Sequence, residues 1–283
     1  MKRLVFYICL LQFAIAFPAM AQKEVKILCY NILEGMTKDS TPDKQEFVKW
    51  VKNQKPTIFA IQEANKFTKE SLAKMAKGWG HPYSVLLKEQ GYPVALTSKY
   101  PIEDVKIVLE NFHHGYIQAK TNGINFIVLH LSPHRWDKRR WEMATILESL
   151  KLQGIEQNSV LLGDFNAFSP LDSTSYRDGK DVARFQELLK KYPKNNYLIN
   201  NKDIDFQTIQ YVLDADYVDA LKALATASPA QAKSILPSPR RIDFIYISND
   251  MLGRLKGGQF IVDDFTKVYS DHKPLFITLK PKS

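Results

Sequence analysis

The sequence contains very little cysteine. Only two of its 283 residues are cysteines, Cys9 in an apolar stretch near the start and Cys29. If the N-terminal stretch is removed after synthesis, Cys29 has no partner, and an intrachain disulfide is excluded. A small fold held together by disulfides is excluded as well. Cys29 lies within an apolar strand pattern, which indicates a position in the core.

Long hydrophobic runs are also missing. The stretch from Leu4 through Phe17 is shorter than the ~20 residues that span a bilayer comfortably. Two basic residues precede it and Ala-Met-Ala follows at 19–21, the small-x-small form of a signal peptidase site. We therefore predict a signal peptide over 1–21, export to the periplasm or the medium, and no transmembrane segment. No linker, repeat or low-complexity stretch divides residues 22–283, which favours a single domain that is a monomer.

Acidic residues are fewer than basic ones. The formal net charge is +9, and it becomes +7 when Lys2 and Arg3 leave with the signal peptide (9 − 2). A basic surface favours anionic partners such as nucleic acid, phospholipid or inositol phosphate, although spread charge also serves solubility. The sequence has no run of basic residues interleaved with aromatics that would mark a nucleic-acid groove.

Strands and helices alternate along the chain. The apolar patterns predict strands over 25–30 and 58–61, with helices beginning at Thr41-Pro42-Asp43 and spanning 68–77. Closely spaced strands follow and imply antiparallel pairing, with Thr121-Asn122-Gly123 as a hairpin turn. We expect them at 83–87, 94–97, 105–109, 115–120 and 124–131, followed by helices over 136–150 and 182–192 and strands over 242–248 and 275–279. Residues 195–239 are poorly periodic and predict short helices and surface loops.

One short stretch, Leu161 to Asn166, presents chemistry at the end of an apolar run. Val160 to Leu162 indicate the end of a buried strand, and Gly163 permits close backbone approach. Asp164 and Asn166 are two residues apart, so both side chains can point into one site while Phe165 packs behind them. A carboxylate beside an amide suits a phosphate-handling centre, whereas the plainer interpretation is a surface turn.

Further polar residues lie at or near the ends of the other predicted strands, in segments far apart along the chain. Each of them alone is compatible with an ordinary solvated turn or loop. They are Asn31, Glu63, His130, Asp243, Asp271 and His272. Their recurrence at strand ends is what makes a shared site the better interpretation.

In the order and spacing of these motifs, the sequence resembles the endonuclease/exonuclease/phosphatase superfamily. This group includes deoxyribonuclease I-like nucleases, apurinic endonucleases, neutral sphingomyelinases and inositol-polyphosphate 5-phosphatases, and a secreted bacterial-type member is expected. The resemblance extends from Val25 to Leu279. It implies an α/β fold, a four-layer α/β/β/α sandwich of two mixed, mainly antiparallel sheets, which agrees with the predicted order of elements.

The resemblance also implies roles. Asn31 and Glu63, with Asp271 nearby, are similar to a divalent-metal site, and such oxygen ligands suit Mg²⁺ and could admit Mn²⁺ or Ca²⁺. Asp164 would position or deprotonate the attacking water, and Asn166 would hold the phosphate. Asp243 would orient His272, the family's catalytic histidine. His130 resembles the second histidine of deoxyribonuclease-like members.

Metal-assisted hydrolysis of a phosphate ester is the implied reaction, with a phosphodiesterase or nuclease favoured. The substrate could be nucleic acid or a phospholipid headgroup. A secreted phosphomonoesterase, a sphingomyelinase-type hydrolase and a non-catalytic phosphate-binding protein are the alternatives.

Other basic residues are conspicuous but have plainer interpretations. His113-His114 are expected in a loop between strands, because no third ligand for a metal is evident. His134 either contacts the substrate or caps the following helix region. Lys138-Arg139-Arg140 predict a solvated helix face, with a phosphate contact as the alternative.

Overall fold

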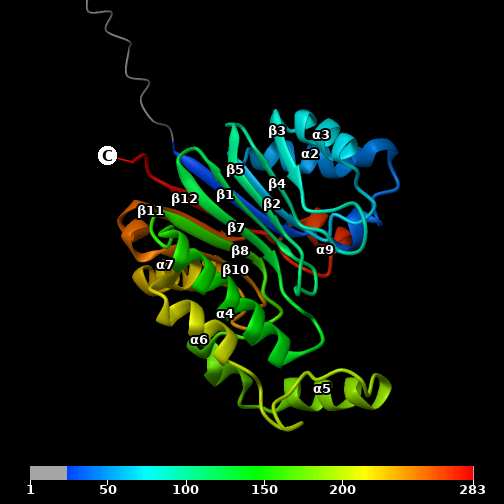
Figure 1. The fold of residues 1–283 in the computed structure, drawn as a ribbon, viewed down its shortest axis with the longest axis vertical. Coiled ribbons are helices and arrows are strands. Elements are labelled where there is room, and N and C mark those ends of the chain that lie inside the picture. Colours follow the sequence, from blue (N-terminus) through cyan, green and yellow to red (C-terminus); the bar gives the residue numbers. More distant parts are fainter. Residues whose placement is uncertain (1–23, 283) are drawn as a thin grey trace, which may run out of the picture.

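The computed structural model describes residues 24–282, which form two six-stranded sheets packed face to face between outer helices (Figure 1). The first sheet consists of β1 (Val25–Asn31), β2 (Ile58–Gln62), β3 (Tyr83–Leu86), β4 (Ala95–Ser98), β11 (Leu255–Phe260) and β12 (Leu275–Leu279). Their order across the sheet is β11–β12–β1–β2–β4–β3.

The second sheet repeats this plan. It consists of β5 (Ile102–Val108), β6 (Tyr116–Thr121), β7 (Ile124–His130), β8 (Ser159–Asp164), β9 (Tyr217–Asp219) and β10 (Asp243–Ser248). Their order is β5–β6–β7–β8–β10–β9. Only one neighbouring pair in each sheet is parallel among the described residues, β1 with β2 and β7 with β8. A parallel pair needs a crossover, and helices α2 (Gln45–Gln54) and α4 (Trp136–Gln153) supply the two crossovers.

The layer between the sheets is an apolar core built from alternate strand residues. Ile27 and Cys29 of β1 point into it together with Phe126 and Val128 of β7 and Leu162 of β8, all without solvent exposure. The residues between them face the outer helices, so both faces of the central strands are covered. This explains why the central strands read as nearly continuous apolar runs.

Helices cover both outer faces. On the first sheet lie α2, α3 (Lys69–Gly78) and α9 (Asp264–Tyr269), and on the second lie α4 and α6 (Gln207–Asp214) (Figure 1). Helices α7 (Ala220–Ala227) and α8 (Ala232–Ile235) pack against β11. The remaining elements are α1 (Leu33–Met36), α5 (Lys180–Lys191) and 3₁₀ helices at Pro42–Lys44, Pro170–Tyr176, Pro229–Gln231 and Asn249–Arg254.

The expected four-layer sandwich is confirmed, and so is the turn before β7. Asn122 and Gly123 have φ values of 51° and 72°, as a two-residue hairpin turn requires. Elements β9, β11 and α9 were not predicted. The sequence of β11, Leu-Lys-Gly-Gly-Gln-Phe, has two glycines and little apolar character, because this strand lies at the sheet edge.

One expected helix start was right in part, and one expected helix face was wrong. A 3₁₀ helix begins at Pro42 after Thr41, whereas α2 begins only at Gln45, and the acceptor for the Phe47 N–H is the carboxylate of Asp39, at 2.9 Å. In α4, Trp141 does not join the apolar face, since it is 43% exposed. The predicted signal peptide lies outside the described residues. No helix within residues 24–282 is long and apolar enough to cross a membrane.

Candidate active site

Three polar residues stand side by side at one end of the second sheet. His130 ends β7, Asp164 ends β8 and Asp243 begins β10, and the strand registers pair His130 with Asp164 and Asp164 with Asp243. Each continues the inward-facing positions of its strand, because side chains alternate with a period of two. The polar row therefore forms where the apolar layer between the sheets ends. All three residues are at least 94% buried.

Gly163 allows the two parallel strands to approach at this end. Its φ is +144°, and a Cβ on this residue would lie 1.9 Å from the carbonyl oxygen of Leu129 on β7. No side chain fits in that space, so a glycine is required immediately before Asp164. The close backbone approach expected at this position is confirmed.

Asn31 connects the two sheets at the site. It ends β1, and its Nδ2 donates to Asp164 Oδ2 at 3.0 Å and to Glu63 Oε1 at 3.1 Å. The orientation of the amide follows from these two acceptors. A hydrogen-bond chain therefore joins Glu63 of the first sheet to Asp164 of the second.

Glu63 is held in an unusual backbone conformation just after β2. Its φ is +58°, and residues 33–36 opposite it also have positive φ values, so the Glu34 N–H reaches Glu63 Oε2 at 2.8 Å. Left-handed conformations of non-glycine residues are costly and concentrate at functional sites. Each carboxylate oxygen of Glu63 accepts one hydrogen bond and keeps acceptor capacity for a hard cation. This donor set fits a divalent ion.

His272 and Asp243 form a hydrogen-bonded pair close to the carboxylate of Asp164. His272 Nδ1 lies 2.7 Å from Asp243 Oδ2, and His272 Nε2 lies 3.7 Å from Asp164 Oδ2. Ser270 fixes the loop that carries His272, since its Oγ donates to the Asn31 carbonyl at 2.8 Å and accepts from the His272 N–H at 3.1 Å. Ser270 is an ordinary loop residue in the sequence, and its role as a tether depends on tertiary contacts.

The charges of these groups are coupled. Burial raises the pKa of Asp164 above its usual range, and the neighbouring charge of Asp243 raises it further. For His272, burial alone would lower the pKa, but Asp243 and Asp164 outweigh it and raise the pKa to about 10. At neutral pH one imidazolium therefore lies between two carboxyl groups.

The positive charge of His272 bears on which residues could hold a metal. Asp164, Asp243 and His272 bring ligand atoms within 4.8 Å of one another. A protonated imidazole has no free lone pair for a cation, so this cluster suits proton handling better than metal binding. Glu63 and Asn31 are the better oxygen ligands. Asp271 is exposed, and its charge acts on His272.

His130 is kept neutral by its surroundings. Burial lowers its pKa well below the ordinary value, and His114 and His272 add to the effect. Its ring stacks on His114 with centroids 4.3 Å apart, and its Nε2 lies 3.6 Å from Asp164 Oδ2. The loop position expected for His114 is confirmed, but nothing in the sequence predicted this stacking. To predict it, one would have to know that this loop lies beside the end of β7 in the folded protein.

Asn166 lies beside Asp164 but is not free. Its backbone N–H donates to Asp164 Oδ1 at 2.8 Å, and its Nδ2 donates to the Leu131 carbonyl at 3.0 Å. Its φ of +48° turns the chain away from the strand at this point. One of the two N–H groups of the amide thus has an acceptor and the other is available, so the role in holding a phosphate stays a prediction.

A basic groove of about 660 Å³ adjoins the site. It is lined by His113, His134, the cations Arg135, Lys138 and Lys194, and the exposed Trp141, over whose ring Lys138 Nζ lies at 4.0 Å. Its single acid, Asp137, is paired with Arg135 at 2.6 Å. Arg135, Lys138 and Trp141 come from one run of the sequence that mixes basic and aromatic residues, and the fold adds His113 and Lys194 from distant segments.

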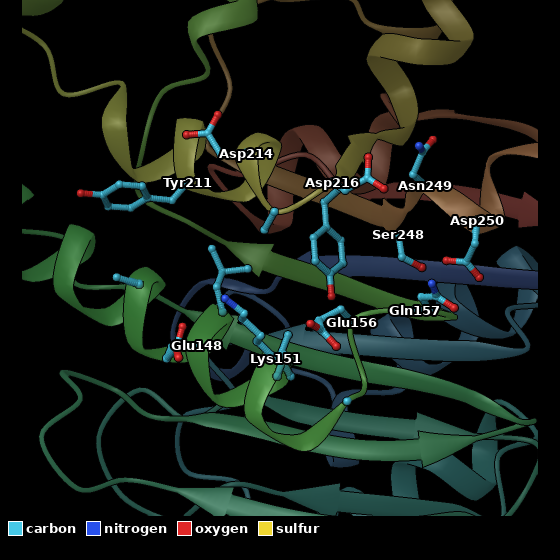
Figure 2. A pocket seen from close by; sticks show the side chains of 16 residues that line it. Glu148, Lys151, Glu156, Gln157, Tyr211, Asp214, Asp216, Ser248, Asn249 and Asp250 are labelled. Carbon is cyan, nitrogen blue, oxygen red and sulfur yellow. The ribbon is translucent and has the colours of Figure 1, made fainter.

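Another cavity, of about 680 Å³, lies elsewhere (Figure 2). It is lined by Ser248, the last residue of β10, whereas Asp243 is the first residue of that strand. The cavity is therefore at the far end of β10 from the polar row. Its lining includes the acids Glu148, Asp216 and Asp250, which makes it unsuitable for a phosphate ester.

Comparison with known proteins connects this geometry to a family. The sequence profile described as "Endonuclease/Exonuclease/phosphatase family" matches residues 28–272. No curated protein sequence gives a significant match. Among solved structures, the fold is similar to an AP endonuclease from Archaeoglobus fulgidus, with 20% identity, a TM-score of 0.61 and coverage of 90% of this chain and 99% of the other.

Two further structures share the fold. One is a 3′ phosphatase from Neisseria bound to a product DNA hairpin, with 20% identity, a TM-score of 0.62, and 90% and 99% of the two chains covered. The other is an endonuclease/exonuclease/phosphatase from Beutenbergia cavernae DSM 12333, with 14% identity, a TM-score of 0.64, and 93% and 72% covered. At these identities the likeness concerns the fold.

Proposed function

The chain belongs to the endonuclease/exonuclease/phosphatase family, and from this premise we propose that it is a divalent-metal-dependent hydrolase of phosphate esters that prefers phosphodiesters. Family membership supports phosphoester hydrolysis. The main support for a metal-dependent mechanism is the hydrogen-bond chain from Glu63 through Asn31 to Asp164. This chain joins the carboxylate suited to bind the cation to the candidate base.

Glu63 and Asn31 would hold the ion, with Asp271 near them. Mg²⁺ suits these oxygen ligands, and Mn²⁺ or Ca²⁺ are possible substitutes. When bound, such an ion acts as a Lewis acid that draws charge from a phosphoryl oxygen.

Proton transfer would depend on the chain's own residues. Asp164 would orient the attacking water and accept its proton, since Asn31 and the Asn166 N–H hold its two oxygens in place. The imidazolium of His272 would stabilise negative charge on the phosphoryl group, and Asp243 would fix its orientation. His130, neutral and 3.6 Å from Asp164, would donate a hydrogen bond to a phosphate oxygen or the leaving group.

The preference for diesters is supported by the basic groove of His113, Lys138, Trp141 and Lys194, which offers cations and a stacking surface beside the site. The neighbours that act on DNA, by their own descriptions, agree with nucleic acid as a substrate. Phospholipid headgroups and phosphomonoesters are the competing substrates. Export after removal of residues 1–21 and a monomeric state belong to the same proposal.

A substrate screen tests the proposal directly. The protein is assayed with Mg²⁺ and with excess EDTA on plasmid DNA, RNA, sphingomyelin vesicles and 4-nitrophenyl phosphate, with Asp164→Asn as the inactive control. We expect metal-dependent cleavage of nucleic acid that weakens with salt, by a log–log slope of about −0.9 for each phosphate contact on duplex DNA.

Each other outcome has a distinct meaning. Turnover of the monoester with DNA, RNA and sphingomyelin intact would replace the diesterase by a phosphatase. Full activity in EDTA would overturn the metal requirement. Absence of turnover on every substrate would leave a phosphate-binding protein.

A further inference from the structure

Arg139 is a buried cation without a counter-ion. It lies on α4 with 4% exposure, and no carboxylate among residues 24–282 forms an ion pair with it. Its side chain forms one hydrogen bond with the described residues, from Nη1 to the Ser132 carbonyl at 3.1 Å, and its Nε has no partner. The solvated helix face predicted for this residue is therefore wrong.

The charge of Arg139 persists at neutral pH. Burial lowers its pKa, and the attraction of Asp205, Glu142 and Asp164 limits the shift, so that the pKa is about 10. Its neighbour Arg140 shows the ordinary arrangement, since Arg140 pairs with the buried Asp205 at 2.7 Å. A buried guanidinium with an unpartnered N–H is destabilising unless an acceptor reaches it.

Arg139 lines a cavity that an acceptor could enter. The cavity has a volume of about 390 Å³ and also contains Asn166 and His134, so it adjoins the reaction centre. This volume is in the range of small-molecule pockets. Much of its wall is apolar or aromatic, from Phe168, Phe185, Leu188, Tyr197, Pro133 and Ile242.

The other charges of this cavity already have partners. Arg241 is paired with Asp172 at 2.9 Å and with Asp219 at 2.6 Å. Arg240 contacts Asp178 at 2.6 Å. The acid in the lining, Asp181, lies 3.4 Å from Arg240 and 3.7 Å from Arg184. Arg139 is thus the lining cation without a carboxylate partner.

We propose that this cavity, which we call the Arg139 pocket, binds a second oxyanion of the substrate, such as a phosphate on the organic group esterified to the reacting phosphate, with Arg139 as the residue that selects it. The inference rests on the proposed hydrolase function and deepens it. The aromatic walls would pack against the organic group that joins the two anions. A planar guanidinium with free N–H groups is suited to an oxyanion because it presents donors in a fixed fork.

The test compares ligands that differ in one phosphate. Thymidine 3′,5′-bisphosphate, thymidine 5′-phosphate and thymidine 3′-phosphate are titrated by calorimetry into the inactive Asp164→Asn protein and into the same protein carrying Arg139→Gln. We expect the bisphosphate to bind at least about tenfold more tightly than either monophosphate, the scale of one charge-assisted hydrogen bond. In Arg139→Gln this ratio should fall to near one.

The matched control is Lys151→Gln, which removes a cation from an exposed position of the same helix and should leave the ratio unchanged. Turnover supplies a second measurement, with 4-nitrophenyl esters of thymidine 5′-phosphate with and without a 3′-phosphate. Arg139→Gln should raise KM for the bisphosphate substrate and spare kcat. If Arg139 only supported the fold, both substrates would lose activity equally.

Three results would overturn the inference. The first is equal binding of mono- and bisphosphate by the unsubstituted pocket. The second is an unchanged ratio of bisphosphate to monophosphate affinity in Arg139→Gln. If the glutamine variant does not fold, Arg139→Lys replaces it, and an unchanged ratio in that variant is the third. Tight, Arg139-dependent bisphosphate binding without turnover of any ester would refute the hydrolase and leave the pocket intact.

Discussion

Replacing Asp243 by Asn should change the charge of His272. The carboxylate lies 2.7 Å from His272 Nδ1, and it is the largest of the charges that raise the pKa of this imidazole to about 10. Loss of one adjacent opposite charge changes a pKa by about 1–3 units. With the imidazole still buried, we expect the pKa of His272 to fall by about 2–3 units.

This shift has a direct consequence at neutral pH. With a pKa of about 10, His272 is protonated in more than ~99% of molecules at pH 7, and after the substitution a fraction of roughly 10–50% is neutral. Each unit of the shift corresponds to ~1.4 kcal/mol of lost preference for the charged form. The lost charge alone should lower kcat by at most about twofold, because about half or more of the molecules stay protonated. The ring also loses the acceptor that orients it, and for this loss we expect kcat to fall by ~10²–10⁴.

NMR titration of the histidine Cε1–H signals between pH 5 and 11, in EDTA, measures the shift. His81 is the internal reference, because its pKa is lowered to about 4 and its signal should therefore stay nearly constant over this range in both proteins. An ordinary pKa near 6.5 for His272 in the unsubstituted protein would refute the reasoning. The double variant Asp243→Asn/His272→Ala should be little worse than either single one, and additive losses would show that the residues act separately.

Three other predictions concern the metal, the backbone and pH. Glu63→Gln should raise the Mg²⁺ concentration for half-maximal activity at least about tenfold while changing the unfolding free energy by less than ~1 kcal/mol, measured by metal titration and urea unfolding. Gly163→Ala should cost at least ~2 kcal/mol, because its Cβ would meet the Leu129 carbonyl, whereas Gly253→Ala, with open space around it, should stay within ~0.5 kcal/mol. His81 is buried and neutral, and its folded pKa of about 4 lies below the unfolded value of 6.5. Its stabilisation is therefore complete above pH 6.5 and is lost as the pH falls toward 4. Between pH 7 and 5 the free energy of unfolding should fall by ~2 kcal/mol more in the unsubstituted protein than in His81→Gln.

Each of these has a contradicting result. Unchanged metal use by Glu63→Gln would move the ion to other ligands. Equal stability of the two glycine variants would show that β7 and β8 can separate without cost. Parallel pH profiles for the unsubstituted protein and His81→Gln would mean that His81 titrates normally in the folded state.

The order of the layers and the position of the polar residues at strand ends could be predicted from the sequence alone. Apolar residues at alternate positions, such as 25, 27 and 29, define the inward face of a strand, and this local period fixes which side chain comes next on that face. Asn31, Asp164 and Asp243 continue such faces, so their shared direction could be predicted without knowledge of their neighbours. The family resemblance then supplied their expected roles.

Contacts between distant segments could be seen only in the folded structure. The stacking of His114 on His130, the tether from Ser270 to Asn31 and the unpaired burial of Arg139 involve residues whose own sequence neighbourhoods are those of loops and a polar helix face. Local sequence preference does not predict such contacts, because strand register and helix docking are set by packing over the whole core. The polar row formed where the apolar pattern of each strand stopped, but the charges within it were set by which strand lay beside which.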